Sequence, residues 1–389
     1  METSTDTAAR RIKKRKLALT GLVLVFSLIG LGYLGYWAMV GRFYVTTDDA
    51  YVGGNLVTLT ARVPGTVVSI AADDTDLVSA GEPVVSLDPT MARWHLHTAI
   101  SALALTVRNA RAMRAHLSAL EATSHAAYTL YEEARNNERR RRHLVALHAI
   151  SRETWANSVA QTAALKARYL ATQASAQALA DEVGSGPLAQ LPSVRQAATA
   201  VEVAYARLAR CTVRAPVTGY VAKRHVQLGQ HIQPGRPLMV IVPLHNLWVT
   251  ANFKEDDLGS LRLGQKTQMV SEIYGSAVRF EGRVIGIGAG TGSAFALLPP
   301  SNASGNWISI VQRVPVRISL PMALLKHHPL RVGLTVTATV DIHDTHGRML
   351  AAHPRSKPLY QTTVYEHTEH EAQALVHKIL EQNGAFRGF

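Results

Sequence analysis

The stretch Arg62–Val67 (RVPGTV), followed by Val78–Val85 (VSAGEPVV), decides the fold because its pattern returns at residues 214–221 (RAPVTGYV) and 232–239 (IQPGRPLM). Each copy holds an apolar strand, a Pro/Gly turn, a second strand, a Gly-Pro turn and a last strand. One copy alone is too small to bury its apolar face. The two copies are therefore predicted to pair into one small β-sandwich.

The segment between the copies, residues 90–209, is predicted to be an α-helical hairpin. Gly and Pro are absent from it except between residues 184 and 192, and apolar or small residues recur every three or four positions, which is typical of a seam between antiparallel helices. A turn near His148–Ser151 gives arms of similar length, with Ser151 as the N-cap of the second arm. Arms of about 55 residues, rising 1.5 Å per residue, reach roughly 80 Å and bring the two β copies together. The break at 184–192 interrupts the second arm either as a kink or as a loop.

The N-terminus is predicted to be a membrane anchor at residues 17–41 behind a basic cytoplasmic tail at residues 1–16. Residues 17–41 carry no charge, and about twenty apolar residues cross a hydrocarbon core of ~30 Å. The basic run Arg10–Lys16 keeps that end in the cytoplasm and places the rest of the chain outside. A cleaved signal peptide is the alternative, but its apolar core would be shorter, and Ala38–Val40 is a poor cleavage site. The residues chosen to represent the anchor are Leu17, Leu22, Phe26, Tyr36 and Trp37.

The expected fold class is α+β. An N-terminal transmembrane helix is followed by a split lipoyl-like β-sandwich, into which a long α-helical coiled-coil hairpin is inserted. A β-barrel comes next, because apolar and polar residues alternate between Gly turns in this region. The expected boundaries are 42–89 for the first half of the lipoyl-like domain with its lead-in strand, 90–209 for the hairpin, 210–244 for the second half, 245–343 for the barrel and 344–389 for a polar C-terminal extension.

Composition excludes several classes of protein. The single cysteine, Cys211, rules out a disulfide framework and a cysteine-based metal site. The formal net charge is +13, from 41 basic and 28 acidic residues, which fits a protein near anionic membranes as well as a nucleic-acid binder. The basic clusters Arg10–Lys16 and Arg139–Arg142 are not interleaved with the aromatic residues that stack on bases, so we expect no nucleic-acid partner.

Four sets of residues, in order along the chain, carry a family resemblance. They are Thr47–Val52 (TDDAYV), Trp248–Glu255 (WVTANFKE), Gly290–Pro299 (GTGSAFALLP), and Asn302–Trp307 (NASGNW) leading to Val311–Arg317 (VQRVPVR). Together with a single anchor and a sandwich split by a helical hairpin, they make residues 10–343 resemble the HlyD-like membrane fusion proteins, and the EmrA type among them.

The resemblance implies a periplasmic adaptor that performs no chemistry and needs no cofactor or metal. Its implied partners are an EmrB-like major-facilitator transporter in the inner membrane, a TolC-like channel in the outer membrane, and further copies of itself in a ring. The implied cargo is hydrophobic drugs or other toxic amphiphiles, exported at the expense of the transporter's proton gradient. The chain would be a single-pass inner-membrane protein with a cytoplasmic N-terminus and most of its residues in the periplasm.

At the hairpin tip, related adaptors carry an Arg, a Leu four residues on and a Ser seven further, which engage the channel. Arg140, Leu144 and Ser151 match that spacing. The resemblance therefore implies that these residues dock the outer-membrane channel. The alternative is that Leu144 is a seam residue, Ser151 only a cap, and Arg139–Arg142 a solvated face.

The barrel of this family lies near the transporter. The residues implied to contact the transporter or a neighbouring adaptor are Phe253, Lys254, Trp307, Gln312 and Arg313. The alternative places Trp307 in the barrel core and leaves Arg313 as a charge at a strand end.

The C-terminal extension is polar, and a short helix is expected at residues 363–382. His367 and His370 lie three positions apart on it, but no third metal ligand is evident. A solvated helix is therefore preferred over a metal site.

Other classes of protein fit parts of the pattern. A lipoyl or biotin carrier domain presents a modifiable lysine between its two halves, but here the helical insertion stands in that place and no lysine is at its tip. A hydrolase needs a nucleophile with its base or a cluster of acids, and the acidic group Asp73, Asp74 and Asp76 is expected in a solvated turn of the sandwich. The adaptor of a type I protein secretion system has similar architecture and remains the alternative function.

Overall fold

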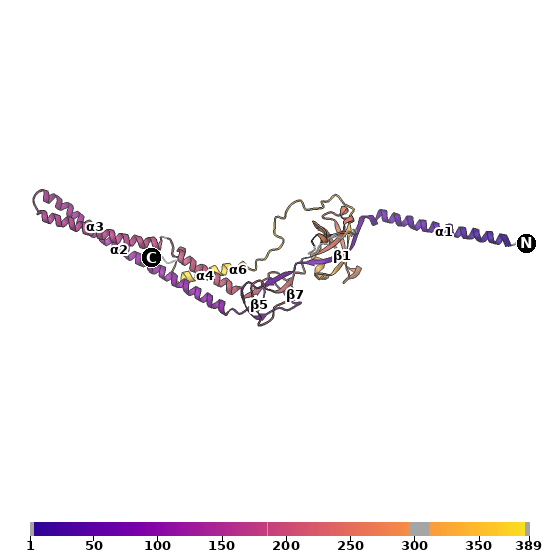
Figure 1. The fold of residues 1–389 in the computed structure, drawn as a ribbon, viewed down its shortest axis with the longest axis horizontal. Coiled ribbons are helices and arrows are strands. Elements are labelled where there is room, and N and C mark those ends of the chain that lie inside the picture. Colours follow the sequence, from indigo (N-terminus) through magenta and orange to yellow (C-terminus); the bar gives the residue numbers. More distant parts are fainter. Residues whose placement is uncertain (1–3, 185, 296–310, 386–389) are drawn as a thin grey trace, which may run out of the picture.

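The computed structural model describes residues 4–184, 186–295 and 311–385, and only the backbone of residues 4–18. The chain is strongly elongated. Helix α1 (Ser4–Met39), a β-barrel, a β-sandwich and a helical hairpin follow one another along one long direction (Figure 1). The start of α1 and the turn of the hairpin therefore lie at opposite ends of the molecule.

The β-sandwich is built from both copies of the repeated pattern. Its strands are β2 (Val57–Thr60), β3 (Gly65–Ile70), β4 (Leu77–Val78) and β5 (Pro83–Leu87) from the first copy, and β6 (Thr212–Arg214), β7 (Gly219–Arg224), β8 (His231–Ile232) and β9 (Pro237–Val242) from the second. The two sheets run β2-β9-β7-β4 and β6-β5-β3-β8. Strands β2, β3, β4 and β5 of the first copy correspond to β6, β7, β8 and β9 of the second. Replacing each strand by its counterpart converts the order of one sheet into that of the other. The predicted pairing of the two copies is confirmed.

The sandwich core is apolar and shared between the copies. Leu87 from the first copy and Ile232, Met239 and Ile241 from the second are at most 1% exposed and belong to one cluster. Since each copy supplies part of this cluster, neither copy has a complete core alone. This explains why the helical insertion must return the chain to its starting point.

The hairpin consists of α2 (Thr90–Ala146), α3 (Arg152–Val183) and α4 (Pro192–Ala209). Residues 147–151 make the turn at the expected place. The Ser151 hydroxyl accepts a hydrogen bond from the backbone N–H of Thr154 at 3.1 Å, which confirms that Ser151 is the N-cap of α3. Glu153, in the first turn, adds a favourable charge at the helix N-terminus.

The break between α3 and α4 is a loop with a short 3-10 turn, η2 (Leu188–Gln190). Gly184 caps the end of α3, and its φ of 70° favours glycine. Leu188 is only 2% exposed because it packs into the hairpin core, and Pro192 is the first residue of α4, where its missing N–H costs nothing. The interruption is therefore anchored to the hairpin by a buried leucine.

The hairpin seam is apolar at the base and thin toward the tip. Leu103, Val107 and Val201 are fully buried at the base. Farther out, the residues buried in α3 include Ser158, Thr162 and Ala176, which contribute little apolar surface. Most of the stabilisation from apolar burial therefore lies near the sandwich.

The barrel is closed by six strands in the order β1-β10-β13-β12-β11-β14. Their bounds are β1 (Tyr44–Gly54), β10 (Leu247–Lys254), β11 (Lys266–Ser271), β12 (Arg279–Ile287), β13 (Arg313–Ser319) and β14 (Thr335–Asp341). The shorter elements around them are η1 (Gly41–Phe43), η3 (Glu255–Ser260), η4 (Gly275–Ala277), η5 (Gly292–Phe295) and α5 (Met322–His327). Strand β1 was expected to lead into the sandwich, but it pairs with β10 and β14 and belongs to the barrel.

The C-terminal extension crosses from the barrel to the base of the hairpin, where α6 (His367–Gln382) lies beside α4 (Figure 1). The expectation of a solvated helix is wrong, because Ala372, Val376, Ile379 and Leu380 are buried. The last three join the apolar core that α2 and α4 form. These residues pack against apolar side chains of α2 and α4 that lie together only in the folded hairpin. Helix α6 therefore makes the hairpin base a three-helix bundle.

Replacing Val376 with Asp is expected to release α6 from the hairpin, because it places an unpaired charge in an apolar core. The local opening free energy should fall by about 3 kcal/mol. Hydrogen exchange of residues 367–385 measures this. Ala374→Asp is the matched control, since Ala374 is on the exposed face of the same helix. Equal protection of α6 in both variants would contradict the observed docking.

Candidate functional site

The N-terminal helix carries an apolar surface suited to lipid. Within the described residues, one segment, Leu19–Phe43, is helical, long and apolar enough to cross a membrane, and none of its most apolar window is buried. Leu22, Phe26, Tyr36 and Trp37 are all more than half exposed. The side chain of Leu17 lies outside the described part of the chain. These exposed apolar residues would be costly in water, so a bilayer is their suitable surrounding.

The anchor joins the barrel through a small aromatic and acidic cluster. The His343 ring stacks on Phe43 with ring centroids 4.3 Å apart, and His343 Nδ1 lies 2.5 Å from Asp341 Oδ1. A hydrogen bond from the His343 backbone N–H lowers the pKa of the Asp341 carboxyl. The end of β14 is thus tied to the end of the anchor.

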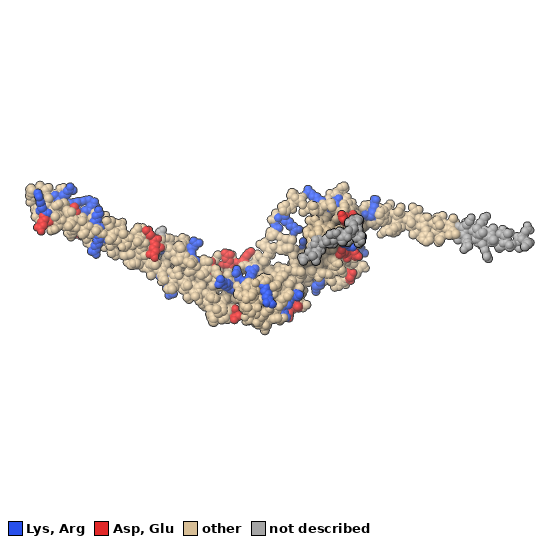
Figure 2. Space-filling model, in the orientation of Figure 1, with Lys and Arg blue, Asp and Glu red and all other residues tan. Residues whose placement is uncertain are grey.

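The hairpin tip exposes all three residues that resemblance assigned to channel docking. Arg140 and Ser151 are exposed, and the Leu144 side chain is 41% exposed although it is apolar. Arg140 donates a hydrogen bond to the Asn137 side chain, one turn back on α2. Figure 2 shows basic residues near this end of the hairpin, where the run Arg139–Arg142 lies. The tip therefore presents an apolar side chain between a cation and a hydroxyl.

Residues from all four resemblance motifs meet at the end of the barrel that faces the anchor. We call this set the rim network; its members are Thr47, Asp49, Asn252, Ser293, Gln312 and Arg313. Arg313 Nη1 lies 3.1 Å from Asp49 Oδ2, and Asn252 Nδ2 donates to Asp49 Oδ1 at 3.1 Å. The β-bulge between Thr47 and Ala50 turns Asp49 toward these partners.

The rest of the rim network ties the neighbouring loops to these strands. The Thr47 hydroxyl donates to the Asn252 carbonyl at 2.9 Å, and the Ser293 hydroxyl donates to Gln312 Oε1. The Gln312 carbonyl accepts from the Glu255 backbone N–H at 3.0 Å. The network therefore holds the ends of β1, β10 and β13 together with η5. Since the Asp49–Arg313 pair is partly exposed, it contributes about 0–1 kcal/mol to the free energy of folding. Its main effect is to fix the positions of the side chains at the rim.

The barrel residues expected to contact a partner differ in their surroundings. Phe253 is fully buried in the barrel core, so its assignment to a contact surface is wrong for this conformation. The alternation along β10 points Phe253 inward and leaves Lys254 exposed. Gln312 and Arg313 are half-buried in the rim network. Trp307 lies outside the described residues.

Sequence reasoning missed Thr47, Asp49, Asn252 and Ser293 as members of this site. The signal was present, because each is a polar residue inside one of the motifs that carry the resemblance. Asn252 also interrupts the apolar residues of β10. What the sequence does not contain is the contact itself, because Asp49 and Asn252 are 203 positions apart.

The acidic group in the sandwich has a structural role. Arg224 Nε lies 2.7 Å from Asp73 Oδ1, and the Arg224 backbone N–H donates to Asp74 Oδ1 at 2.7 Å. The Arg224 hydrogen bond lowers the pKa of Asp73. Because Arg224 belongs to the second copy, this turn links the copies. Across the described ranges, no group of three or more His, Cys, Asp or Glu residues is placed to hold a metal ion.

Comparison with known proteins identifies the family. The sequence profile of the EmrA alpha-helical hairpin domain matches residues 90–211. Multidrug export protein EmrA of Haemophilus influenzae is 37% identical over 372 residues, which cover 95% of this chain and 95% of the relative. Fatty acid resistance protein FarA of Neisseria gonorrhoeae is 40% identical over 346 residues, which cover 88% of this chain and 87% of the relative. Among solved structures, the periplasmic adaptor protein EmrA aligns at 20% identity over 77% of this chain and 99% of that chain, with a TM-score of 0.37.

The relatives match along nearly their whole length, so the similarity includes the anchor, the sandwich, the hairpin and the barrel together. The profile of the hairpin domain matches residues 90–211 alone, and the relatives extend the similarity to most of the chain. The chain therefore belongs to the EmrA family of multidrug export proteins, membrane fusion proteins with an adaptor role.

Proposed function

We propose that this chain is the periplasmic adaptor of a tripartite efflux pump. It links an EmrB-like major-facilitator transporter in the inner membrane to a TolC-like channel in the outer membrane. The observation that carries the proposal is the placement of an apolar anchor and an exposed hairpin tip at opposite ends of one elongated chain (Figure 1). An adaptor between two membranes needs contacts at both of its ends.

The dimensions support this role. Helix α2 has 57 residues, so the arm extends about 85 Å beyond the sandwich at 1.5 Å per residue. In the proposed orientation the basic run Arg10–Lys16 stays in the cytoplasm, and the barrel, sandwich and hairpin lie in the periplasm. Arg140, Leu144 and Ser151 then reach toward the outer-membrane channel.

The rim network and the exposed Lys254 lie at the barrel end next to the anchor. In the proposed assembly this end contacts the transporter or a neighbouring copy of the adaptor, through Lys254, Gln312 and Arg313. In the network the Asp49 carboxylate is paired with Arg313 and hydrogen-bonded to Asn252, which supports a rigid docking surface better than a reactive site. Several copies would form a ring around the transport path.

The proposed cargo is hydrophobic or amphiphilic toxic compounds. The names of the two relatives above support this class, one for multidrug export and the other for fatty acid resistance. The transporter supplies the energy, and the adaptor supplies continuity between the membranes.

The test is deletion of the gene in its native host, with the full chain returned on a plasmid as the control. We expect the deletion strain to become more sensitive to hydrophobic drugs or long-chain fatty acids, and the returned chain to restore growth. Growth inhibition and the set of secreted proteins are measured in the same strains. Loss of a secreted protein with unchanged sensitivity would replace this proposal by the adaptor of a type I protein secretion system.

A further inference from the structure

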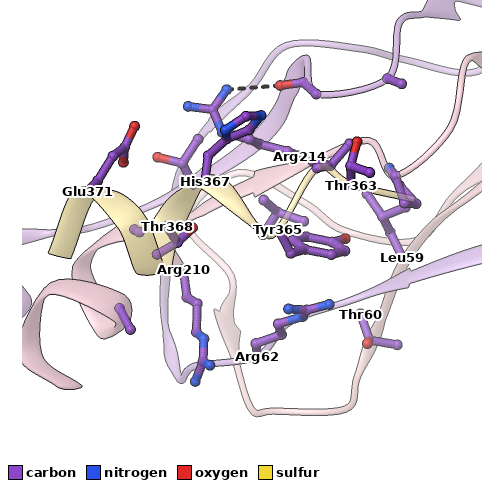
Figure 3. Close-up of a pocket in the computed structure, with 18 of the residues that line it drawn as sticks. Leu59, Thr60, Arg62, Arg210, Arg214, Thr363, Tyr365, His367, Thr368 and Glu371 are labelled. Atoms are coloured by element: carbon purple, nitrogen blue, oxygen red, sulfur yellow. Dashed lines mark hydrogen bonds between the residues drawn. The ribbon is translucent and has the colours of Figure 1, made fainter. Parts of the chain in front are cut away.

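A pocket of about 740 Å³ opens where the sandwich, the base of the hairpin and the C-terminal extension meet (Figure 3). Its walls come from the strand ends around Arg62 and Arg214, from the end of α4 at Tyr205 and Arg210, and from the start of α6. The volume is within the range of pockets that hold small organic ligands. None of the roles discussed above uses this pocket.

The residues that line the pocket carry more positive than negative charge. It contains three arginines, Arg62, Arg210 and Arg214, and Glu371 is the one carboxylate among the described residues that line it. Glu371 Oε2 already accepts a hydrogen bond from the Tyr205 hydroxyl at 2.8 Å. The pocket therefore has a surplus of positive charge and favours an anion.

The guanidinium groups retain donors for a ligand. The Arg62 guanidinium lies 3.8 Å from the centre of the Tyr365 ring, a stacked contact that leaves its edge free to donate. Arg214 Nη1 donates to the Gly81 carbonyl at 2.9 Å, which uses one of its five N–H groups. Among the described residues, no side-chain partner is found for the Arg210 guanidinium. Figure 3 shows Arg62 and Arg210 on the same side of the pocket, below α6.

The other walls combine polar residues, among them Thr60, Thr363 and His367, with apolar ones. The apolar walls include Leu59, Val213, Pro216, Val364 and the ring of Tyr365. A simple inorganic anion would leave these walls in water, whereas an apolar body attached to an acid group would cover them.

We propose that this pocket binds a small anionic amphiphile, with its acid group on Arg62 and Arg210 and its apolar body against Tyr365 and the sandwich edge. Residues 363–371 of the extension form one wall, so an occupied pocket holds the extension on the hairpin base. The ligand thereby stabilises the docking of α6 by binding only the docked state.

The experiment titrates the purified full chain in detergent micelles with 2-naphthoate and follows binding by calorimetry. The matched probe without the acid is 2-naphthylmethylammonium, and phosphate is the probe without the apolar body. We expect a dissociation constant for 2-naphthoate below about 1 mM and much weaker binding of the other two. Hydrogen exchange of residues 363–371 should slow when 2-naphthoate is added.

Arg62→Gln and Arg210→Gln should each weaken 2-naphthoate binding about tenfold, because each removes a charge-assisted hydrogen bond. Arg207→Gln is the matched control, since Arg207 is exposed on the same turn of α4 but does not line the pocket. Partition of the probes into micelles is the same for all variants. Unchanged affinity in both pocket variants, equal binding of the ammonium probe, or phosphate binding as tight as 2-naphthoate would each overturn the proposal. The assay needs neither transporter nor channel, so its outcome is independent of the proposed adaptor function.

Discussion

Leu144→Asp is expected to abolish drug resistance while the amount and the fold of the protein stay unchanged. Leu144 is 41% exposed at the hairpin tip, so an aspartate there meets water and costs the free chain little. In the proposed complex the leucine enters a groove of the channel, where a charge would be buried without a partner. Growth in the presence of a hydrophobic drug, with the adaptor quantified in membranes, measures the effect.

Leu130→Asp is the matched control, because Leu130 is on the same helix, 47% exposed and four turns from the tip. It should keep full resistance. Resistance that persists in Leu144→Asp, or that is lost equally in Leu130→Asp, would show that Leu144 has no docking role.

Two substitutions of Ser151 distinguish a role in channel docking from a role as the cap of α3. Ser151→Ala removes the cap of α3 and should cost about 1 kcal/mol of local stability, with resistance retained. Ser151→Arg removes the same cap and adds a bulky cation, so it should abolish resistance if the tip docks the channel. Equal resistance in the two variants would leave Ser151 as a cap only.

The sequence predicted those parts of the fold that local chemistry determines. The repeated Pro/Gly turns around Pro64 and Pro216 define equivalent strands, and equivalent strands exchange between the two sheets. The absence of Gly and Pro from most of residues 90–209 defines long helices, and Ser151 marks the start of the second. Each of these signals acts within a few residues.

The contacts that the sequence did not reveal join distant residues. Strand β1 alternates as a sandwich strand would, and only its pairing with β10 and β14 assigns it to the barrel. The sequence of α6 looks polar, because its few apolar residues are buried only once α2 and α4 have come together. Of the candidate site, the tip residues were assigned through the resemblance to related adaptors, and the structure shows that they are exposed. The rim network could not be assigned in this way, because its contacts exist only once the barrel has closed.

Phe253→Ala is expected to destabilise the barrel by about 3–5 kcal/mol, which is a large part of the stability of a domain of this kind. Phe253 is fully buried with Phe280 and Met269, so its truncation leaves a cavity that closed strands cannot fill. Native-state hydrogen exchange of the β10 and β13 amides reports the free energy of barrel opening without requiring the whole chain to unfold.

Lys254, the next residue of β10, is expected to behave in the opposite way. The two variants together distinguish a core residue from a contact residue. Lys254 is exposed on the next position of β10, so Lys254→Ala should change barrel stability by less than about 0.5 kcal/mol. If the rim contacts the transporter, Lys254→Ala lowers resistance although the barrel stays intact, whereas Phe253→Ala lowers resistance only in proportion to the loss of folded protein. A Phe253→Ala barrel as stable as the parent would mean that Phe253 is not a core residue, and its assignment to a contact surface would return.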